Sequence, residues 1–156
     1  TRLRFGSGAV RTWSYLVKRP FVVIVALVGS GSRVVLVRQH RYPQPPAWEI
    51  VKGDSERGET FLAAARRELR EETGLAGGRW RKLGRVMPAP GYFNQSGFVY
   101  LATGLSTGRP VPESNGEVLQ LRYASRRTVS RMISRGLIYD NTTLAGLLLA
   151  RKYFSL

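Results

Sequence analysis

The chain has 156 residues, 43% of them hydrophobic and 22% charged, a composition typical of a globular protein with its own core. It contains no cysteine and a single histidine, so disulfide frameworks, thiolate or histidine-cluster metal sites and cysteine nucleophiles are excluded. Its 25 basic residues against 10 acidic ones give a net charge of +15, which favours polyanions such as nucleotides and nucleic acid as partners, although many arginines are expected simply to face solvent.

The first half of the sequence predicts β-strands. Its longest apolar run, residues 21–28, is rich in β-branched side chains and indicates a central strand buried on both faces. A membrane span needs about 20 apolar residues, so we expect none. The other elements expected here are an edge strand at 10–17, a Gly-Ser turn at 29–32, a returning strand at 33–37, a loop with three prolines at 40–46 and a short strand at 48–51.

The second half predicts three helices separated by strands. The first helix runs from about Thr60, a possible N-cap, to Glu72, and Gly74 suits the left-handed position that ends helices. The other expected elements are strands at 79–86, 97–102 and 118–124, loops at 88–96 and 104–116, a helix capped by Ser125 and ending near Gly136, and a last helix capped by Asp140 or Asn141. We therefore expect a single α/β domain over residues 1–156, with a mixed sheet.

Acidic residues concentrate on the first helix and the loop before it. The segment 53–75 carries six of the ten acids against four arginines, a net charge of −2, which leaves +17 on the rest of the chain. Glu68 precedes Glu71 and Glu72 by three and four residues, and each such like-charged pair opposes a helix by roughly 0.2–0.5 kcal/mol. A divalent cation would remove this conflict, and an all-oxygen ligand set favours Mg²⁺ or Mn²⁺. The interleaved arginines leave a second interpretation open, an exposed helix held by salt bridges.

This acidic segment resembles a known signature. Its spacing fits GX5EX7REUXEEXGU, the box of the Nudix hydrolases, at every fixed position: Gly53, Glu59, Arg67, Glu68, Glu71, Glu72 and Gly74, with Leu69 and Leu75 at the apolar positions. Nudix hydrolases cleave nucleoside diphosphates linked to another group, and the resemblance implies an α/β/α sandwich. The metal ligands that it implies are Glu68 and Glu72, assisted by Glu71, Glu59 and the backbone carbonyl of Lys52. Arg67 is implied as the structural partner that orients the carboxylates.

The resemblance extends over most of the chain to one group within the family. Residues 37–42 and 48–50 look like the segment before the box in ADP-ribose pyrophosphatases, and residues 88–91 lie where that group carries a proline. Residues 101–105 and 140–150 are also similar to that group. These flanks imply hydrolysis of the pyrophosphate bond of ADP-ribose or a related nucleoside diphosphate sugar, which gives a nucleoside monophosphate and a sugar phosphate.

Several residues near the box suit such a substrate. Arg38 and Arg41 can clamp phosphates or ribose hydroxyls with their planar guanidinium groups. Glu49 can accept a hydrogen bond from a base amine or a ribose. The aromatic side chains that could stack on a base are Trp48, Tyr42 and Phe93. Packing in the core is the stronger alternative for Trp48, because large aromatic side chains often fill cores.

Two positions depart from the ADP-ribose pyrophosphatases. Lys52 stands where that group usually has alanine, and we expect its side chain to add positive charge at the phosphate site. The loop at 91–96 lacks the acid that many relatives have there, whereas a second loop offers Glu113 and Glu117. A glutamate of this second loop serves as the general base in that group, so either residue is a candidate. Both could equally be solvated loop glutamates.

A nucleic-acid function also remains open from the sequence. The same centre could trim the 5′-terminal pyrophosphate of RNA, or the domain could bind RNA within a larger particle, because basic surfaces bind nucleic acid through counterion release. A scaffold that keeps the box without turnover is a third interpretation. The arginines of the second predicted helix that share much of one face and would suit a polyanion are Arg126, Arg127, Arg131 and Arg135.

The remaining expectations concern assembly and location. Residues 10–28 supply more strand than a minimal box domain needs, and related sugar-nucleotide hydrolases commonly pair through that region, so we expect a homodimer. The chain lacks a secretory h-region, which suggests the cytoplasm, whereas the basic, acid-free residues 1–20 leave an organelle matrix open. Because the chain starts at Thr1, a cleaved or omitted upstream segment also stays open.

Overall fold

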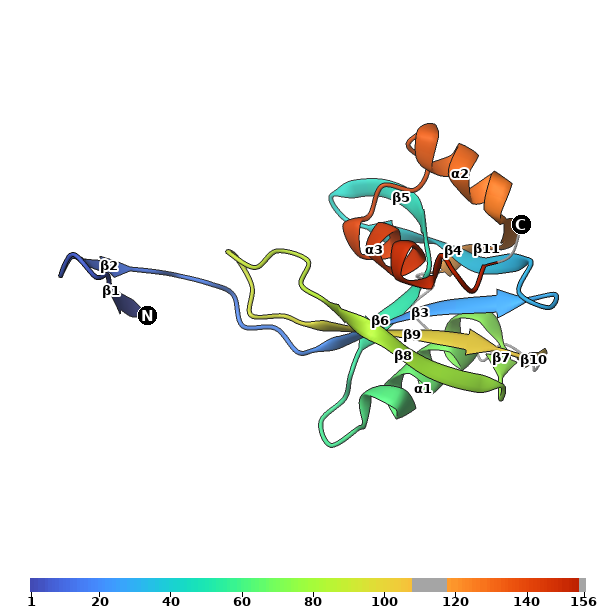
Figure 1. The fold of residues 1–156 in the computed structure, drawn as a ribbon, viewed down its shortest axis with the longest axis horizontal. Coiled ribbons are helices and arrows are strands. Elements are labelled where there is room, and N and C mark those ends of the chain that lie inside the picture. Colours follow the sequence, from blue (N-terminus) through green and yellow to red (C-terminus); the bar gives the residue numbers. More distant parts are fainter. Residues whose placement is uncertain (108–117, 155–156) are drawn as a thin grey trace.

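A computed structural model describes residues 1–107 and 118–154 and has one mixed sheet between two layers of helix (Figure 1). The strand order in the sheet is β11-β4-β3-β9-β8. These strands are β3 (Phe21–Val28), β4 (Arg33–Arg41), β8 (Arg79–Val86), β9 (Gly97–Thr103) and β11 (Val118–Ser125). Because β3 runs parallel to β9 and antiparallel to β4, the predicted mixed sheet is confirmed.

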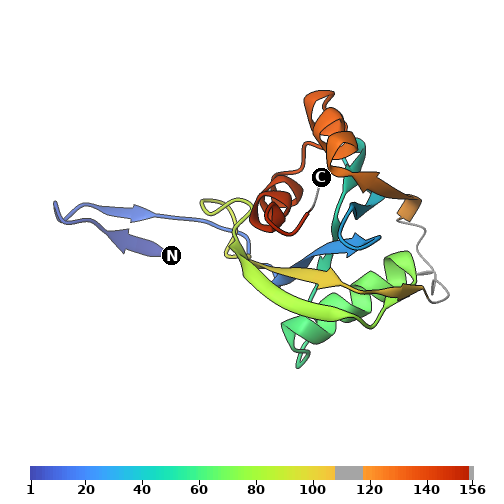
Figure 2. The ribbon, with the colours of Figure 1, turned by 45° about the vertical axis from the view of Figure 1, so that its right-hand side comes forward.

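Within the described residues three helices cover the sheet, and each begins at a predicted cap. They are α1 (Phe61–Thr73), α2 (Arg126–Ser134) and α3 (Asn141–Ala150). Side-chain oxygens of Thr60, Ser125 and Asp140 accept a hydrogen bond from the backbone N–H three residues later. Gly74 ends α1 in the left-handed region, with φ 71°. With α1 on one face and α2 and α3 on the other, the α/β/α sandwich is confirmed (Figure 2).

The central strand β3 contributes to a core on each face, because successive side chains of a strand point to opposite faces. On one face, Ile24 is fully buried in a cluster that includes Leu69 of α1. On the other face, Val25 belongs to a second cluster against α3. There α3 approaches so closely that a Cβ on Gly146 would lie 2.6 Å from a methyl carbon of Ile50. The strand is therefore buried on both faces, as its continuous apolar run predicts.

The sheet divides beside β3, and this division positions the candidate site. β5 (Gln44–Glu49) pairs with β4, whereas β6 (Val51–Asp54) pairs with the first half of β3. β4 pairs with β3 only near the hairpin turn, through Leu27 with Val34 and Val28 with Arg33. The chain crosses from β5 to β6 at a buried Ile50. As a result, one end of β4, β5 and β6 meets α1 and the start of α3.

The predicted loop at residues 40–46 is wrong. β4 continues to Arg41 and β5 starts at Gln44, so two residues connect them. The prolines of β5 are compatible with a strand because β5 lies off the main path of the sheet and its register against β4 shifts between Gln39 and Arg41. A proline lacks the N–H that a central strand would need, but an edge strand at a register shift can do without it.

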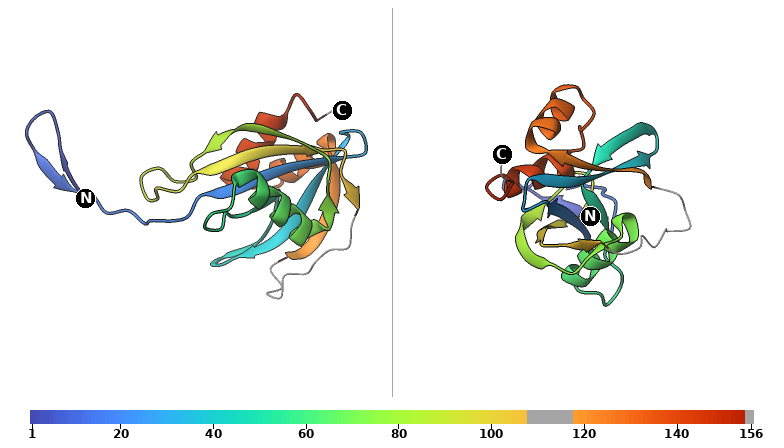
Figure 3. Two further views of the ribbon diagram at one scale, coloured as in Figure 1. Left: turned by 90° about the horizontal axis from the view of Figure 1, so that it is seen from below. Right: turned by 90° about the vertical axis from the view of Figure 1, so that its right-hand side faces the viewer.

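The N-terminal residues form an arm that projects from the sandwich (Figure 3). Here β1 (Arg2–Arg4) and β2 (Val10–Thr12) pair with each other. The predicted edge strand at 10–17 is therefore wrong, because only three of these residues form a strand and that strand does not join the central sheet. Every residue of β1 and β2 is exposed, so no buried face fixes a register against the sandwich. The connector reaches the sandwich at Leu16, which forms a bridge with Phe93.

A second small antiparallel pair, which was not predicted, joins β7 (Leu75–Ala76), directly after α1, to β10 (Ser106–Thr107). β10 falls at the start of the predicted loop at 104–116, whose residues 108–116 lie outside the described range. Across the described residues, none of the helices combines the length and apolar character needed to cross a membrane.

Candidate active site

Arg67 of α1 gathers three of the four box glutamates. Its guanidinium donates to Glu59 (Nε to Oε1, 3.1 Å), to Glu68 (Nη1 to Oε1, 2.7 Å) and to Glu71 (Nη1 to Oε2, 3.0 Å). A further bond to the backbone oxygen of Asp54, 3.0 Å long, ties α1 to the loop before it. The hydrogen bond from Arg67 lowers the pKa of Glu59, and the same contact with Glu59 is the main cause that raises the pKa of Arg67. Arg67 and Glu71, which lie one helical turn apart, thereby also form an ion pair.

Glu68 lies against the backbone of β6. Its side chain is largely buried, and a Cβ built on Gly53 would fall 2.1–2.3 Å from its carboxylate carbon and oxygens. A glycine at this position therefore lets β6 pass directly over the carboxylate. The fixed glycine at the start of the box and the first glutamate of α1 are thus one packing unit, although they are 15 residues apart in the sequence.

Glu72 is held from β4. Its Oε1 accepts a hydrogen bond of 2.8 Å from Nε2 of Gln39, whose side chain is only 1% exposed. Sequence reasoning did not single out Gln39. A signal existed in the alternation along the strand, which turns Val37 and Gln39 inward on either side of the half-buried Arg38.

The donor set suits a hard divalent cation, since four carboxylates and backbone oxygens are the ligands that Mg²⁺ and Mn²⁺ prefer. In this structure Arg67 is the cation on which three of those carboxylates converge. Within residues 1–107 and 118–154, no group of three acidic or histidine side chains surrounds a shared metal position. A metal would require the end of Glu68 to turn from Arg67, which a flexible side chain permits. The ligand types therefore suit a divalent metal ion. In the structure described here, Arg67 binds three of the carboxylates that would hold it.

A buried ion-pair network adjoins the box and corrects the expectation for Lys52. Its Nζ lies 3.0 Å from Oε2 of Glu49 and 2.7 Å from Oδ2 of Asp140. The expectation that Lys52 adds net positive charge to the phosphate site is wrong, because its ammonium is paired with the carboxylates of Glu49 and Asp140. Burial alone would raise the pKa of Asp140, but Lys52 and the hydrogen bonds from Thr142 and Thr143 outweigh it and lower that pKa to about 2.

The substrate candidates fall into two groups. Arg41 and Glu49 belong to the network, with Nε of Arg41 3.3 Å from Oε2 of Glu49. Glu49 is thereby engaged by two cations, so its first role is to hold them. Trp48 is buried in the core with the guanidinium of Arg122 4.7 Å from its ring centroid, a placement that favours packing over base stacking. Arg38 lies opposite it in the register of β4 and β5.

The remaining candidates lie elsewhere. Tyr42 is 96% exposed at the turn between β4 and β5, where its ring is free to stack on a ligand. Phe93 lies beside the N-terminal arm, lines a hollow with Trp13 and Tyr15, and has the ammonium of Lys18 5.5 Å from its ring centroid. Glu113 and Glu117 fall outside the described residues.

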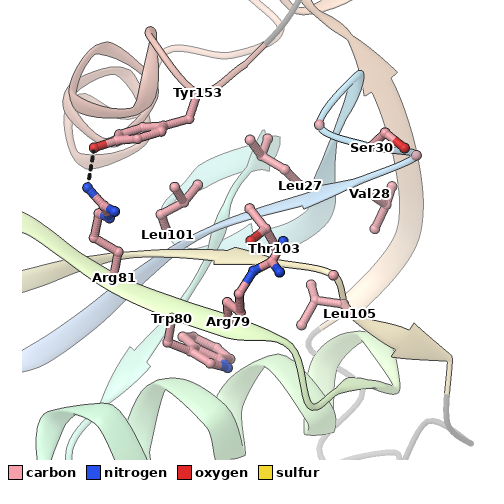
Figure 4. A pocket seen from close by; sticks show the side chains of 13 residues that line it. Leu27, Val28, Ser30, Arg79, Trp80, Arg81, Leu101, Thr103, Leu105 and Tyr153 are labelled. Atoms are coloured by element: carbon pink, nitrogen blue, oxygen red, sulfur yellow. Dashed lines mark hydrogen bonds between the residues drawn. The ribbon is translucent and has the colours of Figure 1, made fainter.

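Two cavities differ in their relation to the box. One of about 230 Å³ is lined by Arg41, Lys52, Gly53 and Asp140, together with residues of the 88–96 loop. It therefore adjoins the box at Gly53, the residue against which the carboxylate of Glu68 packs. A larger one of about 1000 Å³ lies at the opposite end of β3, beside Arg81 and Tyr153, where the Arg81 guanidinium donates to the phenol oxygen (Figure 4). None of its lining residues belongs to the box, so the smaller cavity marks the candidate substrate site.

Comparisons with known proteins agree with this geometry. The NUDIX domain matches residues 18–139. An ADP-ribose pyrophosphatase of Mycobacterium tuberculosis is 32% identical over 150 residues, which cover 94% of this chain and 72% of the relative. An ADP-ribose pyrophosphatase of Bacillus subtilis is 28% identical over 130 residues, which cover 82% of this chain and 70% of the relative.

A solved structure shares the fold. The crystal structure of an ADP compounds hydrolase superposes with a TM-score of 0.84 at 23% identity and covers 97% of this chain and 82% of that one. The domain match spans most of the sequence, the relative in Mycobacterium tuberculosis matches nearly all of it, and the box runs from Gly53 on β6 through α1 to Leu75 on β7. This chain therefore belongs to the Nudix family and is a pyrophosphohydrolase of the kind that generally needs a divalent metal ion.

Proposed function

We propose that this protein hydrolyses the pyrophosphate bond of ADP-ribose or a related nucleoside diphosphate sugar, giving a nucleoside monophosphate and a sugar phosphate. One observation carries the proposal. The complete box, which begins at Gly53 on β6, adjoins a cavity lined by Arg41 and Gly53, in a chain whose relatives in two bacteria are ADP-ribose pyrophosphatases. Lys18 and Arg41 supply positive charge for phosphates at the wall of the cavity, and the box supplies carboxylates nearby.

The metal in this proposal is Mg²⁺ or Mn²⁺, because all its ligands are oxygens. The groups that would hold it are Glu68 and Glu72, with assistance from Glu59, Glu71 and the backbone carbonyl of Lys52. The bound ion supplies charge neutralisation at the phosphate oxygens and lowers the pKa of an attacking water. Arg67 holds three of these carboxylates together and offsets their mutual repulsion, since it donates a hydrogen bond to each.

The substrate would be held by residues around the cavity. Arg41, anchored by Glu49, presents its guanidinium to the phosphates, and Arg38 on the same strand can bind phosphate or ribose oxygens. Tyr42 and Phe93 are the aromatic candidates for stacking on the base. Either Glu113 or Glu117 acts as the general base, and replacing each by glutamine in turn would identify it by the larger loss of kcat.

A panel of substrates with Mg²⁺ tests the proposal. It contains ADP-ribose, GDP-mannose, dinucleoside polyphosphates and 5′-triphosphorylated RNA. We expect ADP-ribose or another nucleoside diphosphate sugar to give the highest kcat/KM. Turnover led by RNA, or no turnover of any member, would refute the proposal.

The metal assignment has its own variants. Glu68→Gln and Glu72→Gln should each lower kcat by more than about 100-fold, because even partners of metal ligands cost 10–100-fold when removed. Circular dichroism should show the fold retained. Glu56→Gln is the matched control, since Glu56 is an exposed acid of the loop before α1 and occupies no fixed position of the box. Full activity of either glutamine variant, or of wild type in excess chelator, would contradict the assignment.

A second candidate function is RNA binding or RNA 5′-end hydrolysis. The observation that favours it is the exposure of all four arginines on one side of α2: Arg126, Arg127, Arg131 and Arg135. Like charges within one short helix repel. A polyanion on this surface would neutralise them.

We also propose that residues 1–156 form one Nudix domain. We propose further that this chain forms a homodimer through its N-terminal arm. An isolated two-stranded hairpin is marginally stable in water, so the arm needs a surface to bind. Its connector exposes Trp13, Tyr15, Leu16 and Val17, with Val17 76% exposed. These residues continue directly into the sandwich beside the 88–96 loop, so a second copy bound to the arm would lie close to the candidate site.

A further inference from the structure

We propose that Gln39 is a positioning residue that orients Glu72 for metal binding and couples it to Arg41. The inference rests on the proposed function, in which Glu72 is a metal ligand. Gln39 lies on β4 and is buried, with Nε2 2.8 Å from Oε1 of Glu72 and its own Oε1 accepting a hydrogen bond from Nη2 of Arg41. One amide therefore connects a carboxylate of α1 to a guanidinium at the edge of the substrate cavity.

The two neighbours of Gln39 allow its amide only one orientation. A carboxylate needs a donor, and a guanidinium needs an acceptor. If the amide rotated by half a turn, its oxygen would face Glu72 and its NH₂ group would face Arg41, so both hydrogen bonds would be lost. Leaving a buried polar group without its partner costs roughly 1–3 kcal/mol. The amide is thus fixed from both sides, and it fixes the carboxylate in turn.

Arg41, the second hydrogen-bond partner of Gln39, is itself held by an ion pair. Nε of Arg41 lies 3.3 Å from Oε2 of Glu49, and Lys52 bridges Glu49 to Asp140, the residue that caps α3. The network therefore runs from α1 through β4, β5 and β6 to the start of α3. Each member is bonded on two sides, which removes the freedom that a lone glutamine on a strand would keep.

A neutral partner suits a metal ligand better than a charged one. Arg67 holds Glu68 by an ion pair, which neutralises that carboxylate until a metal arrives. Gln39 holds Glu72 by an uncharged donor, which orients this carboxylate and does not itself neutralise its negative charge. Partners of this kind typically account for 10–100-fold in metal affinity or activity. Glu72 is accordingly the ligand that is already placed before the metal binds.

The test compares Mn²⁺ binding by wild type and Gln39→Met, followed by the electron paramagnetic resonance signal of free Mn²⁺ without substrate. Methionine keeps the length and apolar volume of the side chain but removes both hydrogen bonds. We expect the Kd for Mn²⁺ to rise about 10–100-fold. Gln120→Met, the same change at an exposed position of β11, should leave the Kd unchanged. Activity of Gln39→Met should recover in part as Mn²⁺ is raised, because the ligands themselves remain.

The outcomes separate this inference from the proposed function. An unchanged Kd in a folded Gln39→Met protein would overturn the inference alone. A wild type that binds Mn²⁺ but does not hydrolyse a nucleoside diphosphate sugar would overturn the proposed function, while the comparison of Kd values would still decide the role of Gln39. If thermal unfolding shows that Gln39→Met does not fold, Gln39→Asn, which retains the amide on a side chain one methylene shorter, must show the loss of Mn²⁺ affinity.

Discussion

Replacing Gly53 by alanine tests how closely β6 fits over the box glutamates. The added Cβ would lie 2.1 Å from the carboxylate carbon of Glu68, whereas ordinary van der Waals contact begins at 3.4 Å. The carboxylate must therefore move by more than about 1 Å, and misplacement of a catalytic group by that amount can cost about 100-fold in rate. Stability should fall by only about 1 kcal/mol, because the displaced atoms end a flexible side chain and an off-rotamer angle costs roughly 0.5–1.5 kcal/mol.

The assay pairs kcat for ADP-ribose with urea unfolding of the same preparation. Gly84→Ala is the matched control, because a Cβ there would meet Leu149 at 3.4 Å, an ordinary contact, and both measurements should stay near wild type. Full activity of Gly53→Ala would mean that the carboxylate of Glu68 does not need the position described here. A decrease of more than about 3 kcal/mol in the free energy of unfolding would mean that the backbone of β6 moves instead of the side chain of Glu68.

Three further predictions concern the surface and the ion pairs. Light scattering at micromolar concentration should give twice the mass of the chain, and an active monomer would refute the dimer. The pKa of Asp140 falls from 3.8 to about 2 on folding, so its stabilisation, about 2 kcal/mol, should be complete above pH 4 and lost as the pH falls through 2. Asp140→Asn, which retains a good N-cap, should make the free energy of unfolding in urea depend less on pH in this acidic range. Identical pH dependence in wild type and variant would refute the stabilisation by Asp140. Glutamine at all four arginines of α2 should flatten the salt dependence of RNA affinity and leave ADP-ribose turnover unchanged, and no RNA binding by wild type near about 50 mM salt would remove that function.

Local signals explain most of what the sequence predicted correctly. The helix α1 begins after Thr60 and ends at Gly74 because the residues that cap it are its immediate neighbours in the sequence. The continuous apolar run of β3 predicts burial on both faces without reference to any partner. The box could be recognised because its fixed positions lie on one helix and one loop, so spacing in the sequence corresponds to spacing in the structure.

The errors and omissions involve partners distant in the sequence. Lys52 was expected to add positive charge at the phosphate site, but Asp140, 88 residues later in the sequence, forms an ion pair with its ammonium. Gln39 lies 33 residues before Glu72, and only the division of the sheet at Ile50 brings β4 against α1. The strands around the prolines at 45 and 46 depend in the same way on a register shift that composition does not show.

The most direct test of the central claim is the identification of products from ADP-ribose by liquid chromatography and mass spectrometry, with Mg²⁺ and with excess chelator. Cleavage of the pyrophosphate bond by a box-bound metal predicts AMP and ribose 5-phosphate in equal amounts with Mg²⁺, and intact ADP-ribose in the presence of chelator. Release of ADP and ribose, undiminished turnover in chelator, or unchanged ADP-ribose at saturating Mg²⁺ would contradict it.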